Sequence, residues 1–251
     1  LLAAFPRIVS RAAATAALCA LGHDHIVGLS PLRLARLFVV EKCALGPGVV
    51  VLLVDGLGRS PALKLPQLRA LRKAGADVTI QAAYPSKSRP AYITLLTGTP
   101  PALHGGRNNR TPGGHGLDTI LARARDAGMT TACVGDRLGW FAELAEGGCD
   151  VARTTETDGD FVRAADDALA SDAKVVFLHW LGVDWSGHAH GGASGQYGAA
   201  ARDADALVKM IVERARGRVV AVVADHGHAA HGGHGGDEPE VVQVPLVLSG
   251  P

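Results

Sequence analysis

The run VVVLLV at residues 49–54 constrains the fold more than any other feature of the sequence. Six consecutive apolar and mostly β-branched residues match a strand that is buried on both faces, as in parallel sheets covered by helices. Similar runs follow at 76–82, 129–135, 174–181, 218–224 and 244–250. Segments with helical spacing of apolar residues lie between them, at 61–75, 117–128, 160–172 and 194–217.

This strand-helix alternation, without Asn-Gly hairpins, predicts an α/β fold: a three-layer α/β/α sandwich around a mostly parallel central sheet. Residues 1–45 are expected to form an Ala/Leu/Arg-rich helical segment of unknown role, in which His23 and His25 flank Asp24 in a surface loop. Residues 46–251 are expected to form the core, as a piece of a longer chain.

The charge balance excludes some partners. Lys and Arg number 25 against 24 Asp and Glu, so neither a nucleic-acid polymer nor a polybasic membrane contact is expected. The longest apolar run near the start, at 12–22, is too short to span a bilayer, so any membrane anchor would lie outside these residues. The four cysteines form no CxxC pair, and Cys133 is interpreted as a small buried apolar residue.

Acidic residues and histidines follow three of the predicted strands. Asp55 follows 49–54, Asp225-His226 follows 218–224, and Asp184 follows the strand at 174–181. Parallel sheets bind ligands beyond the carboxyl ends of their strands. In DWSGH, Asp184 and His188 are four residues apart, so one turn or a tight loop would aim both at one metal ion.

The glycine-rich run HGHAAHGGHGG after Asp225 has two interpretations. It is either a solvated loop that happens to contain His228, His231 and His234, or the second half of a metal site. Its composition alone leaves both open.

A serine-containing segment, YPSKSRPAYITLLTG at 84–98, precedes a helical run expected after Pro90. A hydroxyl at a helix start is either an N-cap or a nucleophile. The same position points backbone N–H groups at any bound anion. Ser86 and Ser88 are therefore both candidate nucleophiles.

The order of these motifs resembles the alkaline phosphatase superfamily. Asp55, PSKSRPAYITLLTG, Asn109, DWSGH, ADHG and GGHGG follow one another as in type I phosphodiesterases/nucleotide pyrophosphatases and in the ethanolamine phosphate transferases of glycolipid-anchor synthesis. The resemblance runs from about residue 48 to the end. It implies an alkaline phosphatase-like fold.

The resemblance also implies a two-metal site with a serine nucleophile. The metals would be two zinc ions, with another divalent ion such as Mn²⁺ as the alternative. One set of ligands would be Asp184, His188 and His234, and the other Asp55, Asp225 and His226. Ser88 would be the nucleophile, bound to the second zinc, and Asn109 would donate to a phosphate oxygen. Ser86 becomes the rival nucleophile.

The implied function is hydrolysis of a phosphate ester, most simply a phosphodiester, through a phosphoseryl intermediate. A phosphoethanolamine-type transferase acting on a lipid or glycan is the alternative, and a non-catalytic, metal-stabilised domain that binds a phosphorylated partner is the alternative of another class. The expected partner is a small phosphate ester or a lipid head group. The expected location is extracytoplasmic or membrane-associated, through segments outside this chain.

Two positions near Ser88 depart from the patterns of related enzyme families. Arg89 replaces the usual Phe beside the nucleophile, and Tyr92 stands where a sulfatase would have Arg. The nucleoside pocket of the diesterases uses that Phe, which argues against a nucleotide substrate.

The remaining histidines are expected to be loop or ligand-orienting residues (His228, His231), loop residues (His104, His115), a core residue (His179) and an exposed residue (His190).

Overall fold

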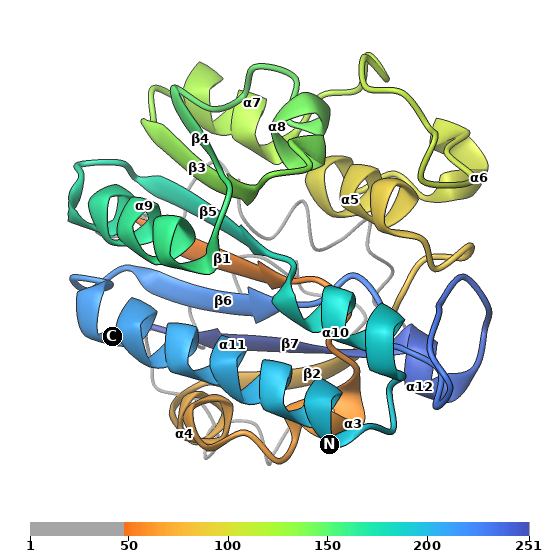
Figure 1. Ribbon diagram of the computed structural model, residues 1–251. Helices are drawn as coiled ribbons and strands as arrows, with labels where there is room; N and C mark the ends of the chain where they lie inside the picture. Colours follow the sequence, from red (N-terminus) through yellow and green to blue (C-terminus); the bar gives the residue numbers. More distant parts are fainter. Residues whose placement is uncertain (1–47, 251) are drawn as a thin grey trace, which may run out of the picture.

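The computed structural model describes residues 48–250, which are built around one seven-stranded sheet in the order β2-β7-β6-β1-β5-β3-β4 (Figure 1). The strands are β1 (Val49–Val54), β2 (Ala76–Gln81), β3 (Thr131–Asp136), β4 (Val151–Thr155), β5 (Val175–Trp180), β6 (Val219–Val223) and β7 (Gln243–Ser249). The predicted segment 1–45, with its His23–His25 cluster, lies outside the described residues.

Strand β1 lies at the centre of the sheet, as its continuous apolar run predicts. It pairs in parallel with β5 on one side and β6 on the other, and every one of its residues is buried. β3 and β4 continue the parallel arrangement beyond β5. At the other edge β7 runs antiparallel to both β6 and β2. The prediction of an α/β fold with a mostly parallel sheet is confirmed.

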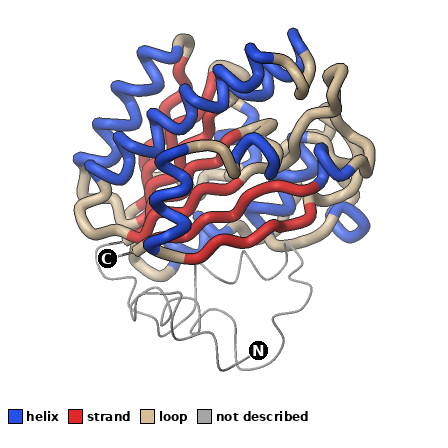
Figure 2. Tube along the Cα trace, turned by 90° about the horizontal axis from the view of Figure 1, so that it is seen from below, coloured by secondary structure: helices blue, strands red, loops and turns tan. Residues whose placement is uncertain are grey.

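Helices cover both faces of the sheet (Figure 2). They are α3 (Arg59–Ala62), α4 (Pro66–Ala74), α5 (Ser88–Thr97), α6 (Pro101–His104), α7 (Ile120–Asp126), α8 (Trp140–Leu144), α9 (Asp158–Ala170), α10 (Gly182–His190), α11 (Gly195–Arg214) and α12 (Pro239–Val242). Helix α11 packs against α4, α9 and α10, whereas α5 packs against α7 and α8. Within the described residues, no helix is both long and apolar enough to cross a membrane.

Several local details differ from the sequence expectations. The helix expected at 61–75 is two helices, because Pro66 starts a new one at its first position. Strand β4 was not predicted, since four of its five residues are exposed at the sheet edge and give no apolar run. Cys133 is buried as expected, but it also forms a disulfide with Cys149, which the interpretation as a small apolar residue did not include.

The topology explains why distant residues meet. Because β1, β5 and β6 are adjacent and parallel, their carboxyl ends lie side by side at the right of Figure 1. Asp55 follows β1, Asp225 follows β6, and Asp184 lies in the first turn of α10, just after β5. Gly56 allows the close approach, because a Cβ at this residue would lie 2.8 Å from the Cα of Asp184.

Candidate metal centre and nucleophile

Asp55 is fully buried at the end of β1, and its two carboxylate oxygens have different surroundings. Oδ2 accepts a hydrogen bond from the hydroxyl of Tyr92 and lies 3.4 Å from Nε2 of His179. Oδ1 is buried without a hydrogen-bond partner among the described residues. A buried, unpaired carboxylate oxygen is costly, so this atom is available to a cation.

Asp225 at the end of β6 shows the same division. Its Oδ1 accepts from the backbone N–H groups of Gly56 and His226, at 3.1 and 2.9 Å. Its Oδ2 is buried and has no hydrogen-bond partner in the part of the chain that is described. Asp55 and Asp225 therefore each present one free oxygen to the same small volume.

His226 completes this first group. Its Nε2 lies 3.5 Å from Oδ1 of Asp55 and 3.2 Å from Oδ2 of Asp225. Its Nδ1 lies 3.1 Å from the carbonyl oxygen of Gly227, which places the ring proton on Nδ1. The lone pair on Nε2 then faces the two free carboxylate oxygens, which is the donor set of a metal site.

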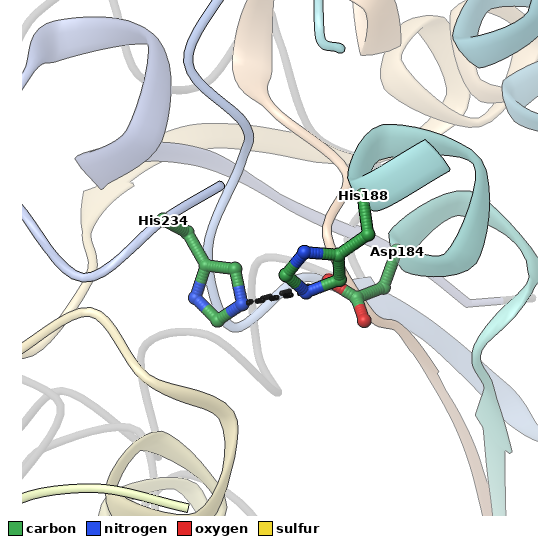
Figure 3. Close-up of side chains that lie close together, drawn as sticks. All are labelled: Asp184, His188 and His234. Carbon is green, nitrogen blue, oxygen red and sulfur yellow. Dashed lines mark hydrogen bonds and ion pairs between the residues drawn. The ribbon is translucent and has the colours of Figure 1, made fainter. Parts of the chain in front are cut away.

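A second group is formed by Asp184, His188 and His234 (Figure 3). Helix α10 places Asp184 and His188 one turn apart, and the glycine-rich loop returns His234 to them. Nε2 of His188 lies 3.5 Å, and Nε2 of His234 3.8 Å, from Oδ1 of Asp184. The side chain of His188 is 49% exposed, so this group is open to solvent.

The two imidazoles of this group face each other with their Nε2 atoms 3.2 Å apart. His234 donates from Nδ1 to the carbonyl oxygen of Ser86 at 2.7 Å, so its Nε2 carries a lone pair. Such a pair is stable only if a proton or a metal ion lies between the nitrogens. In each group the ligand atoms all lie within 4.8 Å of one another, which fits a single ion.

The pKa shifts of the first group also favour a bound cation. Burial, followed by the charges of Asp225 and Asp184, raises the pKa of Asp55 well above its usual value. Burial and the charge of Asp184 raise the pKa of Asp225 to about 8. Burial lowers the pKa of His226 to about 4. The carboxylates therefore cannot all be charged without a nearby cation, whereas this imidazole is neutral and ready to bind one.

Ser88 lies beside the first group. It is the first residue of α5, and its Oγ is 3.1 Å from Nε2 of His226. The helix starts earlier than predicted, because Pro90 is tolerated in a first turn. Ser86 is occupied elsewhere: its Oγ donates to the carbonyl of Gly236 at 2.7 Å and accepts from the N–H of Gly235. Of the two candidate serines, Ser88 is the one whose hydroxyl oxygen lies beside a ligand nitrogen of the first group.

Asn109 and Arg89 define the other side of Ser88. Oδ1 of Asn109 accepts from the backbone N–H of Arg89 at 3.2 Å, which places Asn109 beside the start of α5. Arg89 is buried, binds Glu143 at 2.8 Å and lies over the ring of Trp140. These contacts hold the Arg89 guanidinium, so it is not free to contact an anionic substrate.

The other histidines have varied surroundings. His228 is buried, and its Nε2 lies 2.8 Å from Oδ1 of Asp184, so it orients that carboxylate. It also forms a third, overlapping group with Asp184 and His226. His231 and His190 are exposed, and His115 lies in a loop. His104 was expected in a loop but ends α6.

Tyr92 and His179 are the contacts that sequence reasoning missed. His179 was expected to be an ordinary core residue and Tyr92 only a departure from another family's pattern. Both reach the buried side of Asp55. Burial, followed by the charge of Asp55, raises the pKa of Tyr92 well above its usual value, so its hydroxyl remains a donor. The signal available in the sequence was the four-residue spacing between Ser88 and Tyr92.

Comparison with known proteins identifies the family of this chain. Residues 49–112 and 128–235, more than half of the chain, match the type I phosphodiesterase/nucleotide pyrophosphatase family. The catalytic subunit of human GPI ethanolamine phosphate transferase 2 is 26% identical in an alignment 226 residues long that covers 80% of this chain. The chain spans only 23% of that human protein.

Two solved structures share the fold. Murine ectonucleotide pyrophosphatase/phosphodiesterase 5 superposes with a TM-score of 0.57 at 21% identity, over 72% of this chain and 57% of the murine one. The C-terminal periplasmic domain of EptC from Escherichia coli, in complex with zinc, superposes with a TM-score of 0.59 at 14% identity, over 81% and 72%. The resemblance inferred from the motifs is confirmed, and the chain belongs to the type I phosphodiesterase/nucleotide pyrophosphatase family.

Proposed function

We propose that this chain is a two-metal phosphoryl-transfer enzyme that hydrolyses a phosphodiester. The observation that carries the proposal is the Ser88 hydroxyl, which lies 3.1 Å from Nε2 of His226 beside two buried, unpaired carboxylate oxygens. A serine becomes a strong nucleophile when a neighbouring cation lowers the pKa of its hydroxyl. The family membership supports the same chemistry.

The proposed cofactors are two zinc ions, with Mn²⁺ as the alternative. One ion would be held by Asp184, His188 and His234, and the other by Asp55, Asp225, His226 and Ser88. When bound, the ions would ionise the Ser88 hydroxyl and neutralise the negative charge of the phosphoryl group. Histidine and carboxylate ligands favour zinc, and the zinc complex of the EptC domain supports this choice.

In the proposed reaction, Oγ of Ser88 forms a bond to phosphorus while the bond from phosphorus to the leaving oxygen breaks. The leaving group departs as an alcohol, and Ser88 carries the phosphoryl group. Its position at the first residue of the ten-residue helix α5 favours the anionic group, because the first N–H groups of a helix have no partner within it. Asn109 uses its Oδ1 to accept from Arg89, which leaves its NH₂ to donate to a phosphate oxygen.

The second half of the reaction decides between hydrolase and transferase. If water attacks the phosphorus, the bond from phosphorus to Oγ of Ser88 breaks and Ser88 regains its proton. The ester has then been hydrolysed. If an acceptor alcohol attacks, the phosphoryl group is transferred to a lipid or glycan. The similarity to a GPI ethanolamine phosphate transferase over 80% of the chain favours this alternative. The buried Arg89 in place of a stacking Phe argues against nucleotides.

We further propose that the domain works outside the cytoplasm on a small phosphate ester or a lipid head group. The Cys133–Cys149 disulfide supports an oxidising compartment. The periplasmic location in the name of the EptC domain supports the same location. Membrane association would depend on segments outside these residues.

The test is a rate comparison on matched aryl phosphate mono- and diesters with zinc-loaded protein. The proposal predicts turnover with a preference for the diester, and no turnover by the Ser88→Ala variant. A preference for the monoester would contradict the substrate assignment and leave the metal site intact. Full activity of Ser88→Ala would contradict the nucleophile assignment and favour Ser86. The protein could instead bind the phosphate esters without hydrolysing either of them and without transferring a phosphoryl group to added acceptor alcohols. That result would favour the non-catalytic alternative.

A further inference from the structure

Tyr92 connects the helix of the candidate nucleophile with a candidate metal ligand. It lies on α5 four residues after Ser88, so the two side chains are one helical turn apart. Tyr92 is completely buried, and its hydroxyl donates to Oδ2 of Asp55, which follows β1. A single side chain therefore joins two elements that each contribute a reactive group to the site.

The rest of the Asp55 surroundings shows what this contact does. Nε2 of His179 lies 3.4 Å from the same Oδ2, and the rings of Tyr92 and His179 meet edge to face, with centroids 4.8 Å apart. Two buried groups thus surround one oxygen of the carboxylate. The other oxygen, Oδ1, has no hydrogen-bond partner among the described residues and lies 3.5 Å from Nε2 of His226.

We propose that Tyr92 is a positioning residue, which fixes the rotation of the Asp55 carboxylate so that Oδ1 alone is presented to the metal. The inference rests on the proposed two-metal function. Tyr92 does not touch the substrate; it acts through Asp55. It also sets the distance between this ligand and Ser88, because both Tyr92 and Ser88 belong to the rigid helix α5. Groups that orient a metal ligand typically contribute about 10- to 100-fold to metal affinity.

The chain offers a matched control in Tyr197. This residue is 3% exposed, and its hydroxyl also makes two buried hydrogen bonds, but to the backbone of Gly56 and Gly58 and not to a carboxylate. Tyr92→Phe and Tyr197→Phe each remove one buried hydroxyl. Only the first removes a contact to a proposed metal ligand, so the pair separates positioning from general loss of packing.

The experiment measures zinc affinity by chelator competition, first in the wild-type chain and then in a His234→Ala background. In that background the remaining ion should sit at the Asp55 group. Adding Tyr92→Phe should lower the affinity for this ion about 10- to 100-fold. In the otherwise wild-type chain, Tyr92→Phe should lower the affinity for one ion and leave the affinity for the other unchanged. Tyr197→Phe should leave both affinities unchanged while it lowers the melting temperature.

Three results would overturn the inference. The first is unchanged zinc affinity in Tyr92→Phe, and the second is an equal loss of affinity in Tyr92→Phe and Tyr197→Phe. The third is an equal loss of affinity for both ions in Tyr92→Phe. These results are distinct from failure of the proposed function, which would appear as a wild-type chain that binds no metal at all. If Tyr92→Phe does not fold, the same measurement on His179→Gln should weaken the same ion, because His179 lies against the same oxygen.

Discussion

Zinc binding at the Asp55, Asp225 and His226 group should release protons, and its affinity should rise steeply with pH. Asp225 keeps its proton in the metal-free protein up to a pKa of about 8, because burial and the charge of Asp184 oppose its ionisation. A metal ion binds the ionised carboxylate and must displace that proton. His226, with a pKa of about 4, is already neutral at pH 7 and releases none.

The magnitude follows from these values. Below pH 8, each displaced proton makes the apparent affinity fall about tenfold per pH unit, so roughly 100-fold separates pH 6 from pH 8. Asp55 steepens the dependence, because burial and neighbouring carboxylates raise its pKa as well. Calorimetry in buffers of different ionisation enthalpy counts the protons released. At pH 7 we expect about one proton from Asp225 and more if Asp55 contributes.

The sign for stability is opposite in the metal-free protein. Between about pH 6.5 and pH 8 the unfolded chain has ionised Asp and neutral His, whereas folded Asp225 still holds a proton. The folded state binds more protons, so its stability should fall with rising pH, by roughly 1.4 kcal/mol per unit for one such group. Added zinc should therefore raise the melting temperature more at pH 8 than at pH 6.5. Zinc affinity that does not change from pH 6 to pH 8, with no proton release, would show that zinc does not displace a proton from Asp225.

Three further predictions concern the nucleophile, one ligand and the disulfide. Ser88→Ala should abolish turnover and retain both zinc ions, as measured by initial rates and elemental analysis of the same sample. His234→Ala should lose about one equivalent of zinc, because a site with two ligands left binds far more weakly, whereas exposed His231→Ala should keep both. Replacing Cys133 and Cys149 by Ser should lower the free energy of unfolding by about 3 kcal/mol, since the bridge closes a loop of sequence separation 16.

Specific results would contradict these three predictions. Full turnover by the Ser88→Ala variant would show that Ser88 is not the nucleophile. Unchanged zinc content in His234→Ala, together with a loss in His228→Ala, would move the ligand role to the overlapping group that contains His228. Equal denaturant midpoints with and without reductant would show that the disulfide contributes no stability.

The central architecture was predictable because its signals are local. The apolar run 49–54 has the composition of a strand buried on both sides, and it is the central strand. The parallel neighbours β5 and β6 follow from the same kind of run. The acidic residues after these strands had to meet, because adjacent parallel strands end at one edge of the sheet.

Other features depend on contacts that no local pattern encodes. Strand β4 is exposed at the edge and has no apolar period, so it left no signal. The Cys133–Cys149 bridge depends on how the chain after α8 returns to β3. Tyr92 and His179 each resemble an ordinary core residue in sequence, and only the packing of α5 and β5 around Asp55 brings them to one oxygen atom.

A phosphoryl group on Ser88 would be direct evidence for the proposed mechanism. Zinc-loaded protein would be mixed with an aryl phosphodiester, quenched in acid within the first turnover and digested for mass spectrometry. If Ser88 is the nucleophile, the peptide containing Ser88 gains the mass of the transferred phosphoryl group, and the same peptide from Ser88→Ala does not. Turnover of the ester with no modified peptide, or with the modification on Ser86, would show that Ser88 is not the nucleophile.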